Sequence, residues 1–191
     1  MRCFSCHCLS LTVICQTCQE RLFRPTIKKR TLGSLEVYSF YSYSTIESLL
    51  LLKHKPQGYR VFDALAKMSL KPFIELFTTQ DARDITIIGI DEKIKNGYSH
   101  IATLTKQMQT PHSHPQYASL LAQNSVQYAG KSRKYRENNP RNFLYSGKEN
   151  ISAILIDDII TTGATLTQAY KLLQHHNVRV EFALVLADVR E

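Results

Sequence analysis

The segment that most constrains this chain is an apolar run followed at once by two carboxylates and a hydroxyl-rich turn. Residues 151–156 are apolar enough and long enough for one buried strand, and Asp157 and Asp158 follow them. A helical pattern begins beyond the turn, with an apolar face formed by Leu166, Ala169, Tyr170, Leu172 and Leu173. The sequence therefore predicts a strand, a turn and a helix N-terminus in direct succession.

A turn that leads into a helix N-terminus is typical of a phosphate-binding site. The first N–H groups of a helix have no partner within the helix, and the helix dipole favours an anion beside them. A glycine lets the backbone approach a ligand closely, and threonine hydroxyls add further donors. We therefore predict that phosphate binds to Thr161, Thr162, Gly163, Ala164 and Thr165.

Two aspartates beside a phosphate-binding turn require an explanation, because carboxylates repel a phosphate. A ligand that carries a phosphate at one end and a diol or Mg²⁺ nearby would explain both features. Carboxylates accept hydrogen bonds from ribose hydroxyls and hold Mg²⁺, often through water. A ribose 5-phosphate fits, with its phosphate in the turn and its 2- and 3-hydroxyls on Asp157 and Asp158. The alternative is a plain strand end followed by a capped helix.

The segment Ile154–Thr165 reads Ile-Leu-Ile-Asp-Asp-Ile-Ile-Thr-Thr-Gly-Ala-Thr. It resembles the phosphoribosyl pyrophosphate (PRPP) motif of type I phosphoribosyltransferases. The resemblance implies a phosphate loop at residues 161–165 and a ribose held by Asp157 and Asp158, which become the candidate catalytic residues. It also implies that Mg²⁺ accompanies PRPP.

All five cysteines lie within the first eighteen residues, and four of them form two C-x-x-C pairs separated by eight residues. Two such pairs place four thiolates around one tetrahedral Zn²⁺, the usual closed structural site. A segment this short has no core, so the metal would supply its folding energy. We predict structural zinc on Cys3, Cys6, Cys15 and Cys18, with Cys8 spare and His7 as a competing ligand. Disulfides and an iron–sulfur cluster are the alternatives.

The composition favours anionic partners and a cytoplasmic location. The net charge of +8 suits nucleotides, nucleic acid or acidic lipid, although a generic basic protein has the same balance. No apolar run approaches the length of a membrane span, and the N-terminus lacks the apolar core of a secretion signal. The 43% hydrophobic content is enough for a real core.

Short apolar strands alternate with helical patterns along the rest of the chain. Strands are expected at 35–43, 85–90, 151–156 and 178–186, and helices at 45–55, 59–77 and 100–109. This alternation predicts an α/β fold with a doubly wound, mostly parallel sheet, whose ligands bind at the carboxyl ends of the strands. We therefore expect Asp91 on the same rim as residues 157–165. Residues 110–115 are expected as a polar break in which His112 and His114 form a metal pair or a solvated loop.

The layout as a whole resembles the ComF-type competence proteins, in which a cysteine knuckle precedes a phosphoribosyltransferase-like domain. The shared features are the double C-x-x-C, a leucine helix that ends at Lys53-His54-Lys55 with Gly58 after it, residues 157–165, and Ala187-Asp188-Val189-Arg190. The family's Arg-Gly-Phe-Asn-Gln run is replaced here by residues 96–100. The replacement removes the arginine that would contact pyrophosphate in this family. Lys93 or Lys95 is the candidate substitute for that contact. The expected division is a knuckle at 1–24, a basic linker at 25–33 and the larger domain at 34–191.

This second resemblance implies a role in natural transformation, the movement of single-stranded DNA across the inner membrane into the cytoplasm. A basic run at 131–141 precedes the PRPP motif and is either a lid over an anionic ligand or a solvated loop. Its candidate DNA contacts are Lys131, Arg133, Lys134 and Arg136, with tyrosines nearby on which bases can stack.

Two functions stay open on the sequence alone. The first is a competence factor that binds PRPP with Mg²⁺ and handles single-stranded DNA beside the inner-membrane uptake machinery, in the cytoplasm or peripheral to the membrane. The second is an active phosphoribosyltransferase of nucleotide salvage. No acceptor and no oligomeric state is identifiable.

Overall fold

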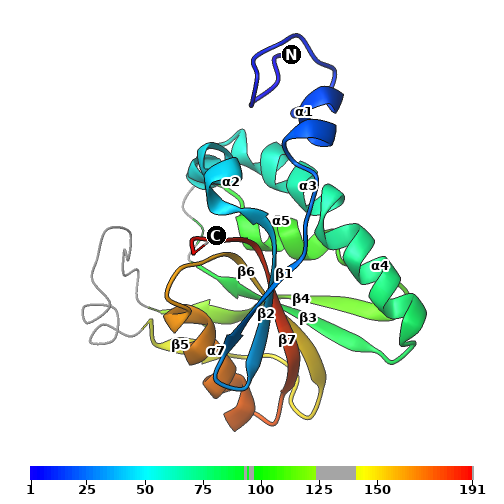
Figure 1. The fold of residues 1–191 in the computed structure, drawn as a ribbon. Helices are drawn as coiled ribbons and strands as arrows, with labels where there is room; N and C mark the ends of the chain where they lie inside the picture. Colours follow the sequence, from blue (N-terminus) through cyan, green and yellow to red (C-terminus); the bar gives the residue numbers. More distant parts are fainter. Residues whose placement is uncertain (93, 95–96, 124–140, 191) are drawn as a thin grey trace.

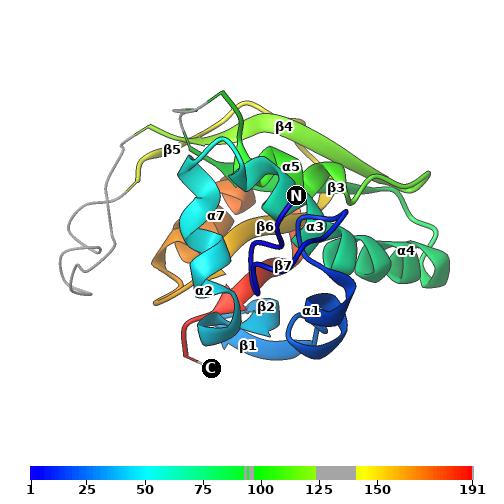
Figure 2. The same ribbon diagram turned by 90° about the horizontal axis from the view of Figure 1, so that it is seen from above.

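The computed structural model describes residues 1–92, 94, 97–123 and 141–190. Its centre is a seven-stranded sheet in the order β1-β2-β7-β6-β3-β4-β5 (Figure 1). The strands are β1 Lys28–Leu32, β2 Leu35–Ser42, β3 Ile85–Asp91, β4 Ser113–Ala122, β5 Phe143–Tyr145, β6 Ser152–Ile160 and β7 Arg179–Asp188. The five inner strands run parallel, and the edge strands β1 and β5 are antiparallel to their neighbours. Figure 2 shows these two edges on opposite sides of the molecule.

Helices cover both faces of the sheet, as the doubly wound prediction requires. They are α1 Gln16–Arg21, α2 Tyr43–Leu50, the 3₁₀ helix η1 Leu51–His54, α3 Gly58–Met68, α4 Leu70–Gln80, α5 His100–Lys106 and α7 Ala164–His175. Within β6, Ile154 and Ile156 pack into the core that includes α2 to α5, whereas Ala153 and Leu155 pack into the core beneath α7. Burial on both faces explains the continuous apolar run. The α/β fold with a mostly parallel sheet is confirmed.

Residues 25–33, expected to form a basic linker, contain strand β1. They pair with β2 from Lys28↔Ser39 to Leu32↔Leu35, across a tight turn in which Gly33 has φ 63°. Charged side chains are a usual protection for an exposed sheet edge, so the basic composition that suggested a linker belongs to an edge strand. The linker prediction was therefore wrong for residues 28–32.

Three other elements differ from expectation in their bounds. The helix expected at 59–77 is two helices that meet at Ser69, because Pro72 has no N–H to continue the first and is tolerated only near the start of the second. The polar break at 110–115 includes the start of β4, and β6 runs on to Ile160 instead of ending at 156. Among the described residues, every helix is too short or too polar to cross a bilayer.

Candidate functional site

The turn between β6 and α7 has the geometry of an anion site. Gly163 caps α7 with φ 85°, a left-handed conformation that a glycine adopts without strain. Among the described residues, the N–H groups of Thr162, Gly163 and Thr165 donate no hydrogen bond, while Ala164 N donates to Thr162 Oγ1 at 3.3 Å. A small pocket opens at this turn and is lined by Asp157 and residues 159–166. The predicted phosphate segment therefore lines a single pocket.

The two adjacent aspartates point to opposite faces of the sheet. Strand β6 continues through both of them, and successive side chains of a strand alternate in direction. Asp157 faces the α7 side and lines the pocket. Asp158 faces the side of α3 and α5, where its Oδ2 lies 3.0 Å from Lys53 Nζ and 3.5 Å from His100 Nε2. The aspartates thus have different surroundings, although both lie at the carboxyl end of β6.

The different surroundings shift the pKa values of the two carboxyls in opposite directions. Burial and the neighbouring charge of Asp158 raise the pKa of Asp157 well above its usual range. Burial also acts to raise the pKa of Asp158, but the charge of Lys53 and the contact with His100 outweigh it and hold that pKa below its usual range. The reciprocal attraction of Asp158 raises the pKa of Lys53 to about 12. Asp158 is therefore the member of the pair that is ionised at neutral pH.

Each aspartate keeps one oxygen open. Asp157 Oδ1 accepts a hydrogen bond from Asp158 N at 2.8 Å, and Asp158 Oδ2 faces Lys53 and His100. Within the described part of the chain, Asp157 Oδ2 and Asp158 Oδ1 have no hydrogen-bond partner. Two open carboxylate oxygens beside an anion-binding turn can accept hydroxyl hydrogens or coordinate a hard cation.

The 3₁₀ helix η1, which contains Lys53, is fixed to the loop after β3. Tyr98 Oη donates to Lys53 O at 2.7 Å. Gly58 is required beneath this contact, because a Cβ there would lie 2.1 Å from Leu52 O and 2.3 Å from Tyr98 Oη. These contacts join the leucine helix, Lys53 and Gly58 into one structural unit. This unit places Lys53 beside Asp158.

Asp91 lies at the end of β3, and both of its carboxylate oxygens accept hydrogen bonds from neighbouring groups of the protein. Ser99 Oγ donates to Asp91 Oδ1 at 2.7 Å, and Ala118 N donates to Oδ2 at 3.1 Å. Burial raises the pKa of Asp91 above its usual range. Beside it, the bound Arg141 holds the pKa of Glu92 below its usual range, even though burial alone would raise it. Asp91 therefore fastens the start of α5 instead of facing a ligand.

Sequence reasoning missed the partners that surround the aspartates, which are Lys53, His100, Glu92 and Arg141. Lys53, His100 and Arg141 stood in segments that the sequence had singled out, but none of them was assigned a role at the aspartates. The predicted DNA contacts Lys131, Arg133, Lys134 and Arg136 lie outside the described residues, as do Lys93 and Lys95.

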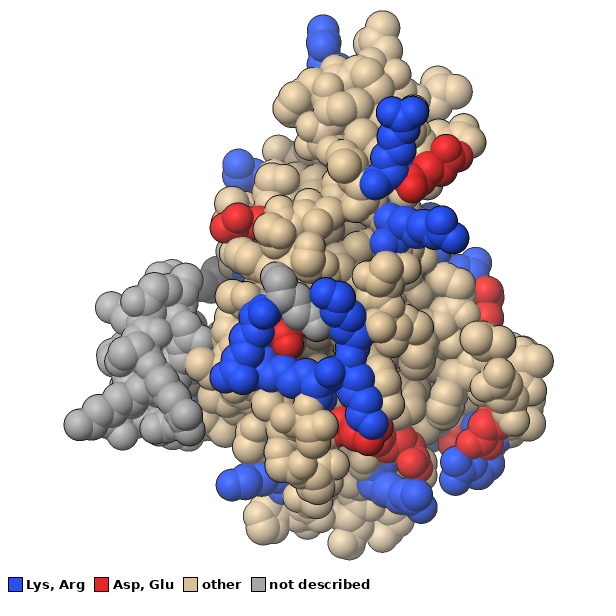
Figure 3. Space-filling view, in the orientation of Figure 1, with Lys and Arg blue, Asp and Glu red and all other residues tan. Residues whose placement is uncertain are grey.

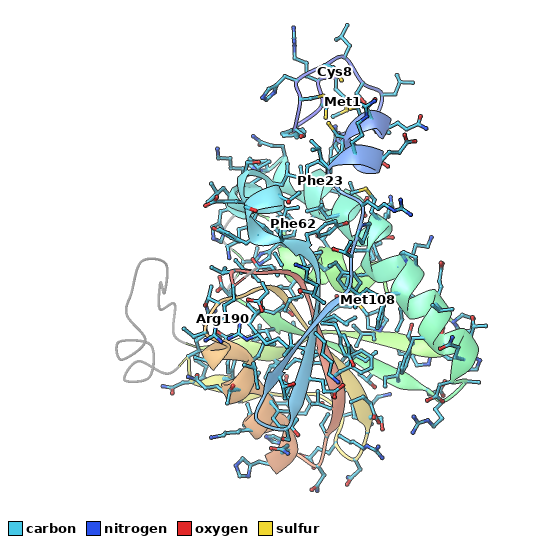
Figure 4. All side chains as sticks on the ribbon, in the orientation of Figure 1. Met1, Cys8, Phe23, Phe62, Met108 and Arg190 are labelled. Atoms are coloured by element: carbon cyan, nitrogen blue, oxygen red, sulfur yellow. The ribbon has the colours of Figure 1, made fainter. Side chains whose placement is uncertain are left out.

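The candidate metal centre lies in the knuckle, beyond α1, where sulfur atoms gather near the labelled Cys8 (Figure 4). The Sγ atoms of Cys3, Cys6, Cys15 and Cys18 all lie within 4.8 Å of one another. Tetrahedral zinc with Zn–S bonds of about 2.3 Å needs sulfurs about 3.8 Å apart, and Cys6 Sγ lies 3.6 Å from Cys15 Sγ. All five cysteines are free of disulfides. The donor set therefore fits zinc.

Backbone groups and the fifth cysteine border this cluster. Cys3 Sγ accepts hydrogen bonds from Ser5 N at 3.4 Å and Cys15 N at 3.3 Å, as a thiolate ligand does in a zinc knuckle. Cys8 Sγ lies 3.3 Å from Cys6 Sγ, and its hydrogen bonds lower the pKa of the Cys6 thiol to about 6. Beside the starts of β3 and β4, His112 and His114 both approach Asp84 Oδ1, at 3.4 and 3.5 Å. Among the described residues, Cys3, Cys6, Cys15 and Cys18 are the only group of three or more potential metal ligands whose donor atoms lie close enough together to share one ion.

Comparison with known proteins gives matches among solved structures alone. No family model matches the chain, and no curated protein matches it. A hypoxanthine phosphoribosyltransferase from Staphylococcus aureus is 20% identical with a TM-score of 0.39, over 64% of this chain and 62% of that one. An adenine phosphoribosyltransferase is 12% identical with a TM-score of 0.43, over 89% and 88%. An orotate phosphoribosyltransferase from Mycobacterium tuberculosis is 16% identical with a TM-score of 0.41, over 90% and 82%.

This chain thus spans less than two thirds of the Staphylococcus aureus enzyme. At these TM-scores the likenesses carry no argument about ligand or chemistry.

Proposed function

We propose that this chain binds PRPP with Mg²⁺ at the rim where β6 meets α7, as part of a competence factor that handles incoming single-stranded DNA. The observation that supports PRPP is one pocket lined both by open N–H groups of Thr162, Gly163 and Thr165 and by the carboxyl of Asp157. A turn alone suits any anion. A carboxyl in the same pocket favours a phosphate ligand that also carries hydroxyls.

In this proposal each part of the ligand has its own partners. The 5-phosphate accepts hydrogen bonds from the turn, and the ribose hydroxyls donate to Asp157 Oδ2 and Asp158 Oδ1, the two open oxygens. Mg²⁺, bound through carboxylate and phosphate oxygens, would neutralise the pyrophosphate. Lys53 keeps Asp158 ionised and holds its carboxylate in place, so that the hydroxyl acceptor is ready before the ligand arrives.

Calorimetric titration of PRPP with and without Mg²⁺ tests this proposal. We expect saturable binding that is strengthened by Mg²⁺, competition by ribose 5-phosphate, and no competition by ribose alone. The variant Asp157→Ala with Asp158→Ala should lose PRPP binding, and Asp157→Asn should weaken it with the fold retained. Lys67→Ala, on the exposed surface of α3, is the matched control. Unchanged affinity in the double variant would remove the ribose assignment.

The DNA part of the proposal is supported by three features: the resemblance of the sequence layout to ComF-type competence proteins, the net charge of +8, and the basic surroundings of the knuckle. Arg2, Arg21 and Arg24 are exposed on and beside the knuckle, where they can pair with phosphates. In this role the chain acts in the cytoplasm or at the inner membrane, beside the DNA-uptake machinery.

Single-stranded DNA affinity should fall steeply with added salt, because phosphate contacts release counterions. Alanine at Lys131, Arg133, Lys134 and Arg136 should reduce both the affinity and its salt slope. A control variant with alanine at Lys67 and Lys71, two exposed lysines of α3 and α4, should leave both unchanged. Affinity that ignored salt would exclude a phosphate-based contact.

A second candidate function is a phosphoribosyltransferase of nucleotide salvage. The observation that favours it is the place of Asp157 in the ligand pocket, where burial raises the pKa of its carboxyl, since a carboxyl that holds its proton to higher pH suits general acid–base work. An acceptor nitrogen would attack C1 of PRPP and pyrophosphate would leave. Release of pyrophosphate on adding a nucleobase, abolished in Asp157→Asn, would establish turnover, whereas binding without release at any nucleobase would leave the first function.

A further inference from the structure

The turn proposed to hold phosphate is itself held by strand β1. Arg30 Nη1 donates to Thr161 O at 2.9 Å, and Arg30 Nη2 donates to Thr162 O at 3.3 Å. Leu32, two residues along the same strand, packs on Gly163, where a Cβ would lie 2.5 Å from Leu32 Cδ1. The edge strand thus reaches the turn through a forked donor and an apolar contact. Lys and Arg side chains gather on this face of the molecule (Figure 3).

We propose that Arg30 is a positioning residue for the anion site, because it fixes the direction of the N–H groups that bind the phosphate. This inference rests on the proposed function, because it assumes that the turn binds a phosphate group. The peptide bonds of the described residues are all trans, so each carbonyl in the turn points opposite to the N–H of the following residue. Holding Thr161 O and Thr162 O toward Arg30 therefore turns Thr162 N–H and Gly163 N–H away from it. These are two of the N–H groups without an acceptor in the described part of the chain.

Arg30 is itself held by a buried carboxylate. Its Nη1 lies 3.0 Å from Asp188 Oδ1 and 3.2 Å from Oδ2, and the Asp188 side chain is only 3% exposed. Asp188 ends β7, and Val189 N donates to Ile160 O at 2.9 Å, which joins that strand end to the residue before the turn. The guanidinium therefore connects three segments that meet at the rim, β1, the turn and the end of β7.

The geometry favours action through the turn over direct contact with the ligand. Arg30 is not among the residues that line the pocket, and its two terminal nitrogens are committed to two carbonyls and a carboxylate. The pair with Asp188 is neutral overall, so it adds little attraction for an anion. A guanidinium provides several donors in one rigid plane, whereas an ammonium is a point charge that cannot reproduce this fork.

The test measures binding of ribose 5-phosphate to the full chain and its variants. Arg30→Ala should weaken binding by about tenfold or more, the loss expected when charged hydrogen bonds are removed. The matched control is Lys29→Ala on the same strand, because Lys29 is exposed and pairs with Glu36 instead of the turn. It should stay within about twofold of the wild type. Wild-type affinity in Arg30→Ala would overturn the inference.

Two further measurements separate positioning from charge. Arg30→Lys retains the charge without the fork, so it should bind nearly as weakly as Arg30→Ala. Millimolar guanidinium, far below denaturing concentrations, should restore part of the affinity of Arg30→Ala and leave Lys29→Ala unchanged. Wild-type binding by Arg30→Lys, or no rescue by guanidinium, would show that Arg30 does not act through its fork. Asp188→Asn, which loosens the anchor with little change of shape, serves if Arg30→Ala does not fold.

Amide NMR signals provide a readout that needs no ligand. In Arg30→Ala, the amide signals of Thr162 and Gly163 should shift, because the peptide planes that carry these N–H groups are no longer held through Thr161 O and Thr162 O. Signals of core amides such as that of Leu155 should stay in place. If the wild type fails to bind ribose 5-phosphate, the proposed function fails, and these local signals still decide whether Arg30 orders the turn. Unaltered signals at both amides would refute the positioning role.

Discussion

Lys53 Nζ lies 3.0 Å from Asp158 Oδ2, although 105 residues separate them in the chain. The ion pair joins the 3₁₀ helix η1 to the carboxyl end of β6, whereas no ion pair within the described part of the chain includes the adjacent Asp157. Two neighbouring carboxyls therefore differ in role: Asp158 is ionised and held, and Asp157 is open and costly to ionise. This difference leads to the first two predictions.

Replacing Lys53 by Met should destabilise the fold by about 2 to 3 kcal/mol at pH 7, because a buried carboxylate loses its cation. This loss is smaller than the loss of about 3 to 5 kcal/mol that is usual for fully buried pairs, because the Lys53 side chain is 28% exposed. The lowered pKa of Asp158 means that its stabilisation exists above the unfolded-state pKa and is lost as pH falls through the folded-state pKa. The variant should therefore approach wild-type stability in acid.

Urea unfolding at pH 7 and in acid measures this difference. The double variant Lys53→Met with Asp158→Asn serves as control, because it removes the orphaned charge and should recover part of the stability lost at pH 7. Equal stability of the wild type and Lys53→Met at pH 7 would show that the ion pair contributes nothing.

Asp157→Asn should stabilise the protein at neutral pH while it weakens ligand binding. The raised pKa means that the folded state favours the protonated form, so stability is full below the unfolded-state pKa and is lost as pH rises through the folded-state pKa. Asparagine cannot ionise, and its Oδ1 can still accept from Asp158 N. The gain in urea midpoint should be largest at neutral pH and vanish in acid. A gain that did not depend on pH would have another cause.

Two glycines with positive φ form a matched pair for testing the turn. Gly33 has φ 63° with open space where a Cβ would lie, whereas Gly163 has φ 85° and Leu32 Cδ1 at 2.5 Å from that position. Gly33→Ala should cost only the strain of a left-handed alanine, about 1 kcal/mol. Gly163→Ala adds a clash and should cost about 2 kcal/mol or more. It should also weaken ribose 5-phosphate binding, which Gly33→Ala should not. Thermal unfolding and calorimetry measure the two effects, and equal behaviour of the variants would mean that Leu32 yields freely.

Native protein should contain about one zinc per chain, and Cys15→Ser should lower that content and loosen the N-terminus. Cys3→Ser should do the same, since both thiols belong to the close cluster. Cys8→Ser is the matched control, because Cys8 lies beside that cluster without belonging to it. Elemental analysis and limited proteolysis check these outcomes. Absence of zinc from the native protein would reject the metal assignment.

The parts of the fold that were predictable from the sequence have local signals. Apolar runs marked the inner strands β3, β6 and β7, because parallel strands bury both faces, and Gly163 among threonines marked the start of α7. The inner strand β4 has a polar start and was not predicted. The cysteine spacing likewise predicted the cluster. Strand β1 has no such signal: its alternation is hidden by Lys28, Lys29 and Arg30, which read as a solvated linker.

The surroundings of the aspartates could not be predicted, because they come from distant segments that only the tertiary fold brings together. Lys53 and His100 meet at Asp158 through α3 and α5 packing on one face of the sheet. The opposite directions of Asp157 and Asp158 had a weak signal, the apolar Ile159 and Ile160 that continue the strand beyond them. A strand that includes both residues must point them to different sides.

Strand β1 also sets a limit on how the chain can be dissected. Thr26 N already donates to Phe40 O at 2.8 Å, so attachment to the sheet begins only eight residues after Cys18. A deletion that removes the knuckle together with residues 25–33 would strip Arg30 and Leu32 from the turn and disable a site more than a hundred residues away in sequence. If such a truncation lost ligand binding, the loss could be attributed to the knuckle by mistake, although it came from the removal of Arg30 and Leu32. A swap or removal of the knuckle is interpretable only if the cut falls before Thr26.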